Sequence, residues 1–298
     1  MTPSISFKTP AKVNFGLHIL GKREDGFHEL ETLFQMVNWC DEIKIECLSR
    51  GLELVCNQPD IPTDKGNLVI RAAHILQTRY PERCKGARIH LNKNIPHGAG
   101  LGGGSGNAAG VLLGLNFLWG LKLKREDLIS VASELGSDVP FFLFSPCAIG
   151  RGRGEILEPV KNSIRFYVLM VYPGFAVPTA SVYGNLKLKL TKRENNISIL
   201  KNFLLQSELA QLGATWSNDL ELFVFKEYPG LSGIKKEMLA LGAKGALLSG
   251  SGSTVFGIFD NPETANSAHA RLDRGKFMLF LAESVVSLSE LYPEEMLH

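Results

Sequence analysis

Several features that mark common classes of protein are scarce or missing in this sequence of 298 residues. No apolar run approaches the roughly 20 residues that a bilayer-spanning helix needs. Residues 1–15 contain neither a basic region nor a continuous apolar segment, so they do not resemble a signal peptide. The five cysteines include no Cys-x-x-Cys pair, and an odd number cannot all pair within the chain, so we expect reduced core thiols. These absences favour a cytoplasmic protein.

The sequence also has little excess charge of either sign. Its 32 lysines and arginines nearly balance 30 aspartates and glutamates, which leaves a net charge of +2. So small an excess does not favour a nucleic acid or a membrane surface as a partner. The one basic cluster, residues 187–193, is expected to be a solvated loop. We therefore expect no nucleic-acid or membrane partner, and we infer no obligate protein partner.

Glycine is concentrated in one place. Residues 96–106 read Pro-His-Gly-Ala-Gly-Leu-Gly-Gly-Gly-Ser-Gly, with an alternating, strand-like segment before them and an apolar, helix-like segment after them. Ser105 and Asn107 are the candidate N-caps of that helix. A loop with few side chains can bring its N–H groups close to an anion, and a helix N-terminus adds further donors. The pattern predicts a cradle for a polyphosphate, and the alternative is a flexible linker.

The residues around this loop exclude the commonest nucleotide loops. A Walker A loop ends in Gly-Lys-Ser/Thr, and no lysine occurs between Gly98 and Gly120. The glycines do match the short Gly-x-Gly-x-x-Gly pattern of dinucleotide-binding proteins, but the acidic residues about 20 positions on, Glu126 and Asp127, are expected to begin a helix rather than end a strand. Protein-kinase signatures such as His-Arg-Asp and Asp-Phe-Gly are absent.

Apolar periodicity predicts a mixed α/β first domain, residues 1–158. Alternation predicts strands, and apolar residues spaced three and four apart predict helices, one of them closed by Pro81 and another by Gly136. The expected strands are residues 4–14, 42–56, 88–93 and 139–144, and the expected helices are residues 67–80, 108–119 and 124–135.

The second half, residues 159–298, predicts a different arrangement. Its expected elements follow the order β-α-β-β-α-β, which is typical of a ferredoxin-like domain, with a helical insertion over residues 197–225. The expected strands are residues 166–172, 246–249, 254–259 and 277–282, and the expected helices are residues 231–241 and 262–272. An apolar content of 45% and a length suited to two domains fit an α+β globular protein.

Two polar residues and a second glycine turn also stand out, and each has an ordinary structural explanation. Asp138 lies on a tight connection between Gly136 and Pro140, where an aspartate can simply bond its own backbone. Lys12 lies within an expected strand, where lysine is commonly a solvated edge charge. Residues 249–253, Ser-Gly-Ser-Gly-Ser, can close a hairpin or hold a ligand. From these residues alone both interpretations stay open.

Three stretches resemble, in order, the motifs of the GHMP small-molecule kinases. Residues 96–105 resemble the second motif, and residues 248–256, Leu-Ser-Gly-Ser-Gly-Ser-Thr-Val-Phe, resemble the third. The first motif is matched by Pro10-Ala-Lys-Val-Asn14 and by Gly21-x-Arg23-x-Asp25-Gly26-Phe27-His28. The match spans nearly the whole chain. One departure is Gly106, where the family usually has a second serine whose hydroxyl is missing here.

This resemblance implies a two-domain GHMP kinase fold, with a first domain like the second domain of ribosomal protein S5 and a ferredoxin-like second domain. It implies transfer of the γ-phosphoryl group of ATP to an alcohol, with Mg²⁺ brought by ATP. In the resembled kinases the residues matching Asp138 and Lys12 act as general base and as its electrostatic partner. The residues expected at ATP are Pro96, His97, Gly98, Ala99, Gly100, Leu101, Gly102, Gly103, Gly104, Ser105 and Gly106, with Gly250, Ser251, Gly252 and Ser253 beside the phosphates.

The expected acceptor carries a cytidine diphosphate group. An aromatic face beside a ring that can both donate and accept, as in Phe27-His28, can stack on a pyrimidine and bond its edge, although most such pairs only pack. The resemblance implies that His28 reads cytosine between two aromatic faces. The residues expected at the acceptor are Asn14, Phe27, His28, Thr179 and Tyr183.

Two other functions remain as alternatives. A homoserine or mevalonate kinase would share the loop and the fold, but the stretch from Arg23 to His28 favours the cytidylated acceptor of the non-mevalonate isoprenoid route. A ligand sensor without catalysis would need neither a base nor its cationic partner. The presence of both Lys12 and Asp138 therefore favours an enzyme.

Overall fold

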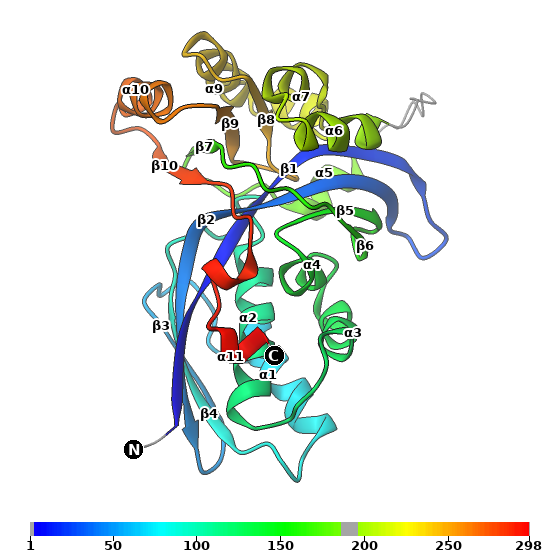
Figure 1. Ribbon diagram of the computed structural model, residues 1–298, viewed down its shortest axis with the longest axis vertical. Helices are drawn as coiled ribbons and strands as arrows, with labels where there is room; N and C mark the ends of the chain where they lie inside the picture. The colour runs from blue at the N-terminus through cyan, green and yellow to red at the C-terminus, as the bar shows by residue number, and fades with distance from the viewer. Residues whose placement is uncertain (1–2, 186–195, 298) are drawn as a thin grey trace.

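The computed structural model describes residues 3–185 and 196–297. The expected basic loop of residues 187–193 lies outside these described residues. Two β-sheets lie one above the other in Figure 1, and a long hairpin, β1 (Ser4–Lys22) and β2 (His28–Leu48), runs from one to the other. None of the helices in the described part of the chain combines the length and the apolar character needed to cross a bilayer.

The first sheet is built on this hairpin. One edge of β2 pairs with β1 along its whole length, and its other edge pairs with β4 at one end and β5 at the other, so the order is β3-β4-β2-β5-β6 with β1 beside β2. The remaining strands are β3 (Leu52–Cys56), β4 (Gly86–Asn92), β5 (Cys147–Gly152) and β6 (Ile156–Pro159). The expected strand at residues 42–56 is therefore two strands, separated by a turn at Gly51, whose φ is +81°.

Helices pack on one face of this sheet and enclose the first core (Figure 1). They are α1 (Leu68–Arg79), α2 (Gly103–Leu118), α3 (Arg125–Leu135) and α4 (Val139–Phe144). α2 is the central one, because it is apolar on nearly all sides and packs against α1, α3, α4 and the β1–β2 hairpin. Burying one leucine such as Leu112 contributes about 1.5–3 kcal/mol, so this helix is fixed mainly by packing.

One expected strand is wrong: residues 139–144 form the helix α4. A short apolar run cannot be assigned to strand or helix by periodicity alone, because a buried strand and a buried helix are both apolar at every position. Pro140 was the available signal, since proline is favoured in the first turn of a helix and removes a donor from a strand. Val139, Phe141 and their neighbours are buried against α2.

The expected N-caps of α2 are also wrong. The helix begins at Gly103, and the preceding Gly102 has φ +69°, so Ser105 and Asn107 lie inside the helix. No side chain caps this end. The Asn107 amide instead donates to Thr9 Oγ1 at 2.8 Å in the buried core.

The second sheet confirms the ferredoxin-like prediction. Its order is β10-β7-β9-β8 and every neighbouring pair is antiparallel, as expected when β-α-β-β-α-β folds into one layer. Its elements are β7 (Tyr167–Tyr172), α9 (Pro229–Ala240), β8 (Gly245–Leu248), β9 (Val255–Phe259), α10 (Pro262–Leu272) and β10 (Met278–Glu283). The helices between β7 and α9 are α5 (Thr179–Gly184), α6 (Asn196–Leu205), α7 (Leu209–Thr215) and α8 (Glu221–Glu227).

The two halves pack against each other at several places. In the middle of β1, the Phe15 ring contacts Phe166 and Phe256 of the second half, with ring centroids 5.5 and 6.1 Å apart. After β10 the chain returns to the first core through η1 (Leu288–Glu290) and α11 (Glu294–Leu297), where Tyr292 contacts Phe7. The boundary at residues 158 and 159 stays a prediction.

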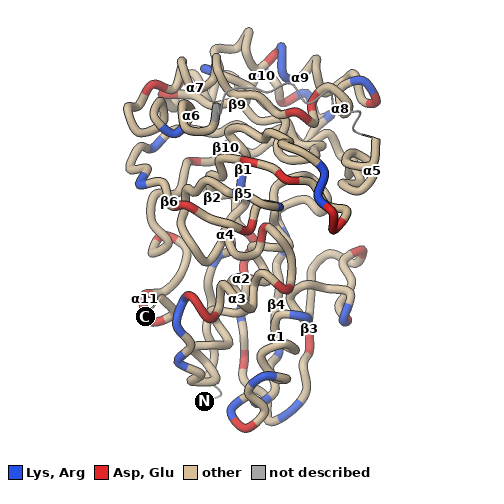
Figure 2. The backbone as a smooth tube through the Cα atoms, turned by 90° about the vertical axis from the view of Figure 1, so that its right-hand side faces the viewer, with Lys and Arg blue, Asp and Glu red and all other residues tan. Residues whose placement is uncertain are grey.

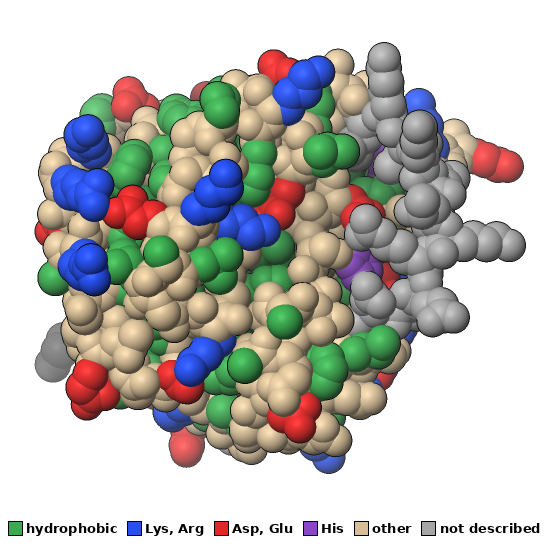
Figure 3. All heavy atoms as spheres, turned by 90° about the horizontal axis from the view of Figure 1, so that it is seen from above, with side chains coloured by type: hydrophobic (Ala, Val, Ile, Leu, Met, Phe, Trp, Pro, Cys, Tyr) green, Lys and Arg blue, Asp and Glu red, His purple; other side chains and the backbone are tan. Residues whose placement is uncertain are grey.

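Charged residues are interspersed over the surface. Figure 2 shows acidic and basic segments alternating over both halves, and Figure 3 shows the same mixture on the end that carries α9 and α10. This distribution accords with the net charge of +2. A function is therefore better sought in a cavity than on a charged face.

Candidate active site

One cavity of about 960 Å³ gathers residues from seven separate parts of the chain. The predicted residues that line it are Lys12, Asn14, Phe27, His28, residues 96–105, Asp138, Thr179, Tyr183, Gly250 and Ser251. Gly106, Gly252 and Ser253 were also predicted to be site residues, but they do not line this cavity. The chain thus brings most of the predicted site together, while the role of each residue stays a prediction.

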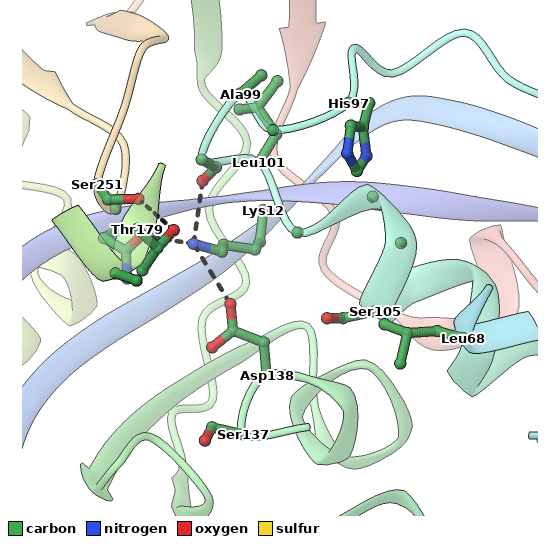
Figure 4. Close-up of a pocket in the computed structure, with 18 of the residues that line it drawn as sticks. Lys12, Leu68, His97, Ala99, Leu101, Ser105, Ser137, Asp138, Thr179 and Ser251 are labelled. Atoms are coloured by element: carbon green, nitrogen blue, oxygen red, sulfur yellow. Dashed lines mark hydrogen bonds and ion pairs between the residues drawn. The ribbon is translucent and has the colours of Figure 1, made fainter. Parts of the chain in front are cut away.

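Lys12 is buried at the base of this cavity, where its side chain is held by acceptors from two elements. Its Nζ donates to Asn14 Oδ1 at 2.8 Å and to the Gly100 carbonyl at 3.1 Å. Asp138 Oδ2 lies 3.8 Å from the same nitrogen, and Figure 4 shows the carboxylate pointing toward it. Burial lowers the pKa of Lys12, and the Asp138 charge offsets part of that effect.

Asp138 is presented by the corner between two helices. α3 ends at Leu135, and Asp138 directly precedes α4, but its carboxylate makes no capping bond to that helix. The side chain is 36% exposed, so one face of it remains open to the cavity. A turn residue that only bonds its own backbone does not account for a carboxylate that points into the cavity. A group that exchanges protons with a ligand must be exposed to it, and a cationic neighbour suits that role.

Asn14 was expected to hold the acceptor. Its amide is 1% exposed and is engaged on both sides, by Lys12 and by Thr32, whose Oγ1 accepts from Asn14 Nδ2 at 2.8 Å. Asn14 therefore holds Lys12 in place. A further contact with the acceptor stays a prediction.

The glycine loop needs its glycines for two physical reasons. Gly98, Gly100 and Gly102 all have φ between +67° and +78°, which other residues rarely adopt. A side chain on Gly100 would also place its Cβ 2.1 Å from the carbonyl oxygen of Ser249. Glycine is thus required at Gly100 by both conformation and close approach.

That close approach joins the two glycine loops. Ser249 Oγ donates to the Gly100 carbonyl at 2.9 Å, and Thr254 N donates to the Ala99 carbonyl at 3.2 Å. The segment does close the β8–β9 hairpin, since Ser249 N donates to Thr254 O at 2.9 Å. The hairpin interpretation of residues 249–253 is therefore confirmed, and the same turn also braces the first loop. That these residues hold a ligand stays a prediction.

The N-terminus of α2 opens into the cavity. Gly103, Gly104 and Ser105 line it, and Figure 4 shows Ser105 on the first turn of this helix with Leu68 beside it. The 16-residue helix has no acidic residue in its own first turn, so no side chain of that turn opposes the positive dipole end that faces the cavity. This end can bind phosphate groups.

A buried ion pair lies beneath the loop and was missed by the sequence analysis. Lys93 pairs with Asp41, whose other oxygen accepts from the backbone nitrogens of Asn94 and Ile95 at 2.7 and 2.8 Å. Asn107 Nδ2 donates to Asp41 Oδ2 at 2.8 Å. This cluster fixes the end of β4 and the first turns of α2 relative to each other. No local pattern marks it, because its members are far apart in the chain.

Aromatic residues form another part of the cavity. The rings of His28 and Tyr183 lie 5.3 Å apart, whereas Phe27 is 52% exposed and contacts the Arg153 guanidinium at 4.8 Å. Burial and the charge of Lys22 lower the pKa of His28, so its imidazole is neutral at neutral pH. Burial raises the pKa of Tyr183. A neutral imidazole offers one donor and one acceptor, as the edge of a base requires.

Arg153 was not predicted to be a site residue, although a signal was present. It stands between Gly152 and Gly154, whose φ values are +72° and +111°, and this turn directs the segment to the cavity. Thr32 was also missed, and it carried no signal, because a threonine inside a strand is ordinary.

Comparison with known proteins gives a consistent result. Residues 67–146 match the family model described as the GHMP kinases N terminal domain, and residues 199–277 match the one described as GHMP kinases C terminal. A 4-diphosphocytidyl-2-C-methyl-D-erythritol kinase from a Geobacter species is 43% identical, covering 89% of this chain and 93% of its own length. The same kinase from Chlorobium phaeobacteroides is 42% identical, covering 94% of this chain and 97% of its own length.

Solved structures agree with these relatives. A crystal structure of 4-(cytidine 5'-diphospho)-2C-methyl-D-erythritol kinase superposes with a TM-score of 0.82 at 36% identity, covering 94% of this chain and 99% of that one. Homoserine kinase from Cytophaga hutchinsonii superposes with a TM-score of 0.75 at 22% identity, covering 96% of each chain. The second likeness shows a shared fold alone.

Proposed function

We propose, because this chain belongs to the GHMP kinase family, that it phosphorylates the 2-hydroxyl of 4-diphosphocytidyl-2-C-methyl-D-erythritol with ATP. The products are the 2-phosphate and ADP. The chain is an ATP-dependent small-molecule kinase of the non-mevalonate route to isoprenoid precursors. The observation that carries the proposal is a single cavity that holds the Lys12–Asp138 pair, the glycine loop and the His28–Tyr183 rings.

The glycine loop supports binding of the triphosphate. Phosphoryl transfer depends mainly on positioning and on neutralising phosphate charge. The N–H groups at the start of α2 and the buried ammonium of Lys12 supply donors and positive charge in the same cavity. The second glycine loop keeps Gly100 in place and therefore acts on the shape of the first.

Asp138 and Lys12 support the chemical step. The acceptor oxygen forms a bond to the γ-phosphorus, the bond from that phosphorus to the β-bridging oxygen breaks, and the hydroxyl proton passes to Asp138. Lys12 places a cation beside the Asp138 carboxylate and offsets negative charge on the transferring group. The 3.8 Å between them leaves Asp138 without a direct hydrogen bond to Lys12, so its lone pairs remain available to the acceptor.

The aromatic part of the cavity supports recognition of the cytidine. His28 is neutral and can pair with the cytosine edge, while Tyr183 lies against its ring and supplies an apolar face. Phe27 is half exposed beside Arg153, so it is free to cover a base from the other side. Thr179 bonds Ser251 at 2.9 Å in the same cavity and is proposed to contact the acceptor.

Mg²⁺ fits this cavity as an ion that arrives with ATP. It keeps several waters and phosphate oxygens and needs only one or two oxygen donors from the protein. The Ser105 hydroxyl on the first turn of α2 lines the cavity and can supply one of them. Within the described residues, no group of three or more His, Cys, Asp or Glu side chains forms a metal cage. The bound ion would neutralise phosphate charge.

The direct test is to measure ADP release with Mg-ATP and each candidate acceptor in turn. We expect turnover with the cytidylated erythritol and none with homoserine or mevalonate. Turnover with either of the latter would instead favour another GHMP kinase activity. Binding of the cytidylated compound without ADP release would favour a ligand sensor. A cytoplasmic location stays a prediction from the sequence.

A further inference from the structure

Thr32 lies beneath the proposed catalytic lysine and has no assigned role. It is in the interior of β2, pairs with Leu17 of β1 across the ladder, and is 1% exposed. Its Oγ1 donates to the Gly16 carbonyl at 2.6 Å and accepts from Asn14 Nδ2 at 2.8 Å. A buried hydroxyl needs hydrogen-bond partners, and both partners of this one lie next to the Lys12 site.

The bond to Gly16 is available because β1 is irregular there. The register of β1 against β2 shifts between Asn14 and Leu17, so residues 15 and 16 have no partner in that ladder. Such a bulge redirects backbone groups, and it frees the Gly16 carbonyl to accept from a side chain. The irregularity lies two residues after Asn14 and four after Lys12, next to the site.

The direction of these bonds follows from the number of protons. A hydroxyl has one proton, and the Gly16 carbonyl can only accept, so the Thr32 proton is used in that bond. Thr32 can then only accept from Asn14, which places the NH₂ group of the amide toward Thr32. The two ends of an amide are nearly identical in shape, so a hydrogen bond is what decides between them.

The oxygen of Asn14 is thereby turned toward Lys12. The ammonium has three protons and no acceptor. One proton goes to Asn14 Oδ1 and one to the Gly100 carbonyl, which leaves one for Asp138 and the space in front of it. With the amide reversed, two donors would face each other and Lys12 would lose its shortest bond.

We propose that Thr32 is a positioning residue for phosphoryl transfer: its hydroxyl fixes the orientation of the Asn14 amide, which in turn holds the Lys12 ammonium beside Asp138. Thr32 lines the cavity, but it is 1% exposed and its only hydroxyl proton is used by the Gly16 carbonyl, so it acts through Asn14 rather than on the substrate. The proposal rests on the proposed function, since it assigns Lys12 to the transfer step.

The experiment compares Thr32→Val, which keeps the shape and removes the hydroxyl, with Thr32→Ser, which keeps the hydroxyl. We expect Thr32→Val to lower kcat by on the order of 10-fold, the cost of one misplaced hydrogen bond, with both KM values within about 2-fold of wild type. Thr32→Ser should retain most of the wild-type kcat. Equal losses in the two variants, or a loss confined to KM, would overturn the proposal.

A second comparison separates positioning from a general loss of packing. In a Lys12→Met background, Thr32→Val should cost nothing further in the single-turnover rate, because the group that it positions is gone. The same loss in both backgrounds would mean a structural effect and would overturn the proposal. If Thr32→Val does not fold, Thr32→Ala replaces it in both comparisons.

The two proposals can fail separately. A wild-type protein that releases no ADP with the cytidylated acceptor contradicts the proposed function. An active wild type whose kcat is unchanged in a folded Thr32→Val variant contradicts the role of Thr32 alone.

Discussion

Lys12 Nζ and Asp138 Oδ2 lie 3.8 Å apart, and their surroundings differ sharply: the lysine side chain is 5% exposed, whereas the aspartate side chain is 36% exposed. The separation exceeds that of a hydrogen bond but keeps the charges in strong contact. One partner is thus fixed in the protein while the other faces the cavity. Such an arrangement suits a fixed cation that supports a base with access to substrate.

The first prediction concerns Asp138→Asn. The amide keeps the shape of the carboxylate but cannot take a proton, so the transfer step should slow by roughly 10²- to 10⁴-fold with ATP binding nearly intact. Single-turnover measurements with saturating ATP and acceptor report this step directly. A transfer rate near that of wild type would mean that a loose transition state needs no base, and that Asp138 only orients the hydroxyl.

The second prediction concerns Lys12→Met. Turnover should fall, and the double variant with Asp138→Asn should lose less than the product of the two single losses, because groups that act as a unit are not additive. The four single-turnover rates form a double-mutant cycle. Losses that multiply would indicate that the two residues act independently.

A third prediction follows from the lowered pKa of Lys12. Lys12 acts as a cation, so the transfer rate should fall as pH rises through this pKa, and the fall should begin below the range of an exposed lysine. The Asp138 charge raises the pKa, so Asp138→Asn should move the alkaline fall in its residual activity to lower pH. A shift to higher pH would contradict the assignment of this limb to Lys12.

The glycine loop is best tested at Gly104, the subject of the fourth prediction. An added Cβ at Gly102 would lie 3.0 Å from Lys12 Cγ and would disturb the lysine, whereas at Gly104 the nearest atom is 3.9 Å away. Gly104→Val should therefore keep the fold. Its side chain should keep the phosphate oxygens away from the N–H groups at the start of α2, so ATP binding should weaken by on the order of 10- to 100-fold, the value of one or two hydrogen bonds to a charged group. Calorimetric titration with ATP measures this change.

Gly233→Val is the matched control, because Gly233 is also helical with no atom within 4 Å of the added Cβ, and it does not line the cavity. It should leave ATP affinity unchanged. If ATP affinity falls equally in the two variants, or does not fall in Gly104→Val, the start of α2 is not part of the phosphate site.

The sequence and the structure agree where the constraint is local or repeated. The ferredoxin-like order of the second half was predicted because short, continuous apolar runs alternate with longer segments whose apolar residues are three and four apart. The glycine loop followed from composition, since positive φ at Gly100 and neighbouring positions requires residues without a Cβ. Lys12 and Asp138 were assigned by resemblance, and their proximity could not be derived from spacing in the chain.

The failures have a different physical origin. Residues 139–144 are apolar throughout, so the sequence contains no contrast between a buried strand and the buried helix α4. The partners of Asn14 and Lys93 come from distant segments, Thr32 and Asp41, that only the fold brings together. Hydrogen-bond partners of buried polar groups are a tertiary property, and no local pattern encodes them.

The third helical glycine of the loop, Gly106, explains the departure from the family pattern and gives a fifth prediction. A Cβ on Gly106 would lie 2.9 Å from the Pro10 carbonyl oxygen and 3.3 Å from the Phe142 ring. Restoring the family's serine with Gly106→Ser should therefore destabilise the fold by about 1–3 kcal/mol, as overpacking does. Denaturant unfolding measures the change, and Gly106→Ala should show the same loss, because the Cβ and not the hydroxyl is at fault. A serine variant of wild-type stability would contradict this explanation.

The recognition of cytosine rests on a neutral His28. His28→Ala should weaken binding of the cytidylated acceptor by about 1–3 kcal/mol, the penalty for leaving a buried polar edge of the base unpaired, and should leave the KM for ATP unchanged.

The pKa of His28 is lowered first by burial and then by the charge of Lys22, so the imidazole gains a proton only below the ordinary histidine range. Protonation converts its one acceptor to a donor, so the KM for the acceptor should rise as pH falls through this lowered pKa. Lys22→Met removes one of the two causes, so the rise should begin at higher pH than in wild type. If this rise of KM at low pH disappears in His28→Ala but begins at the wild-type pH in Lys22→Met, burial alone lowers the pKa of His28. If KM still rises at low pH in His28→Ala, another group titrates, and this histidine does not recognise the cytosine.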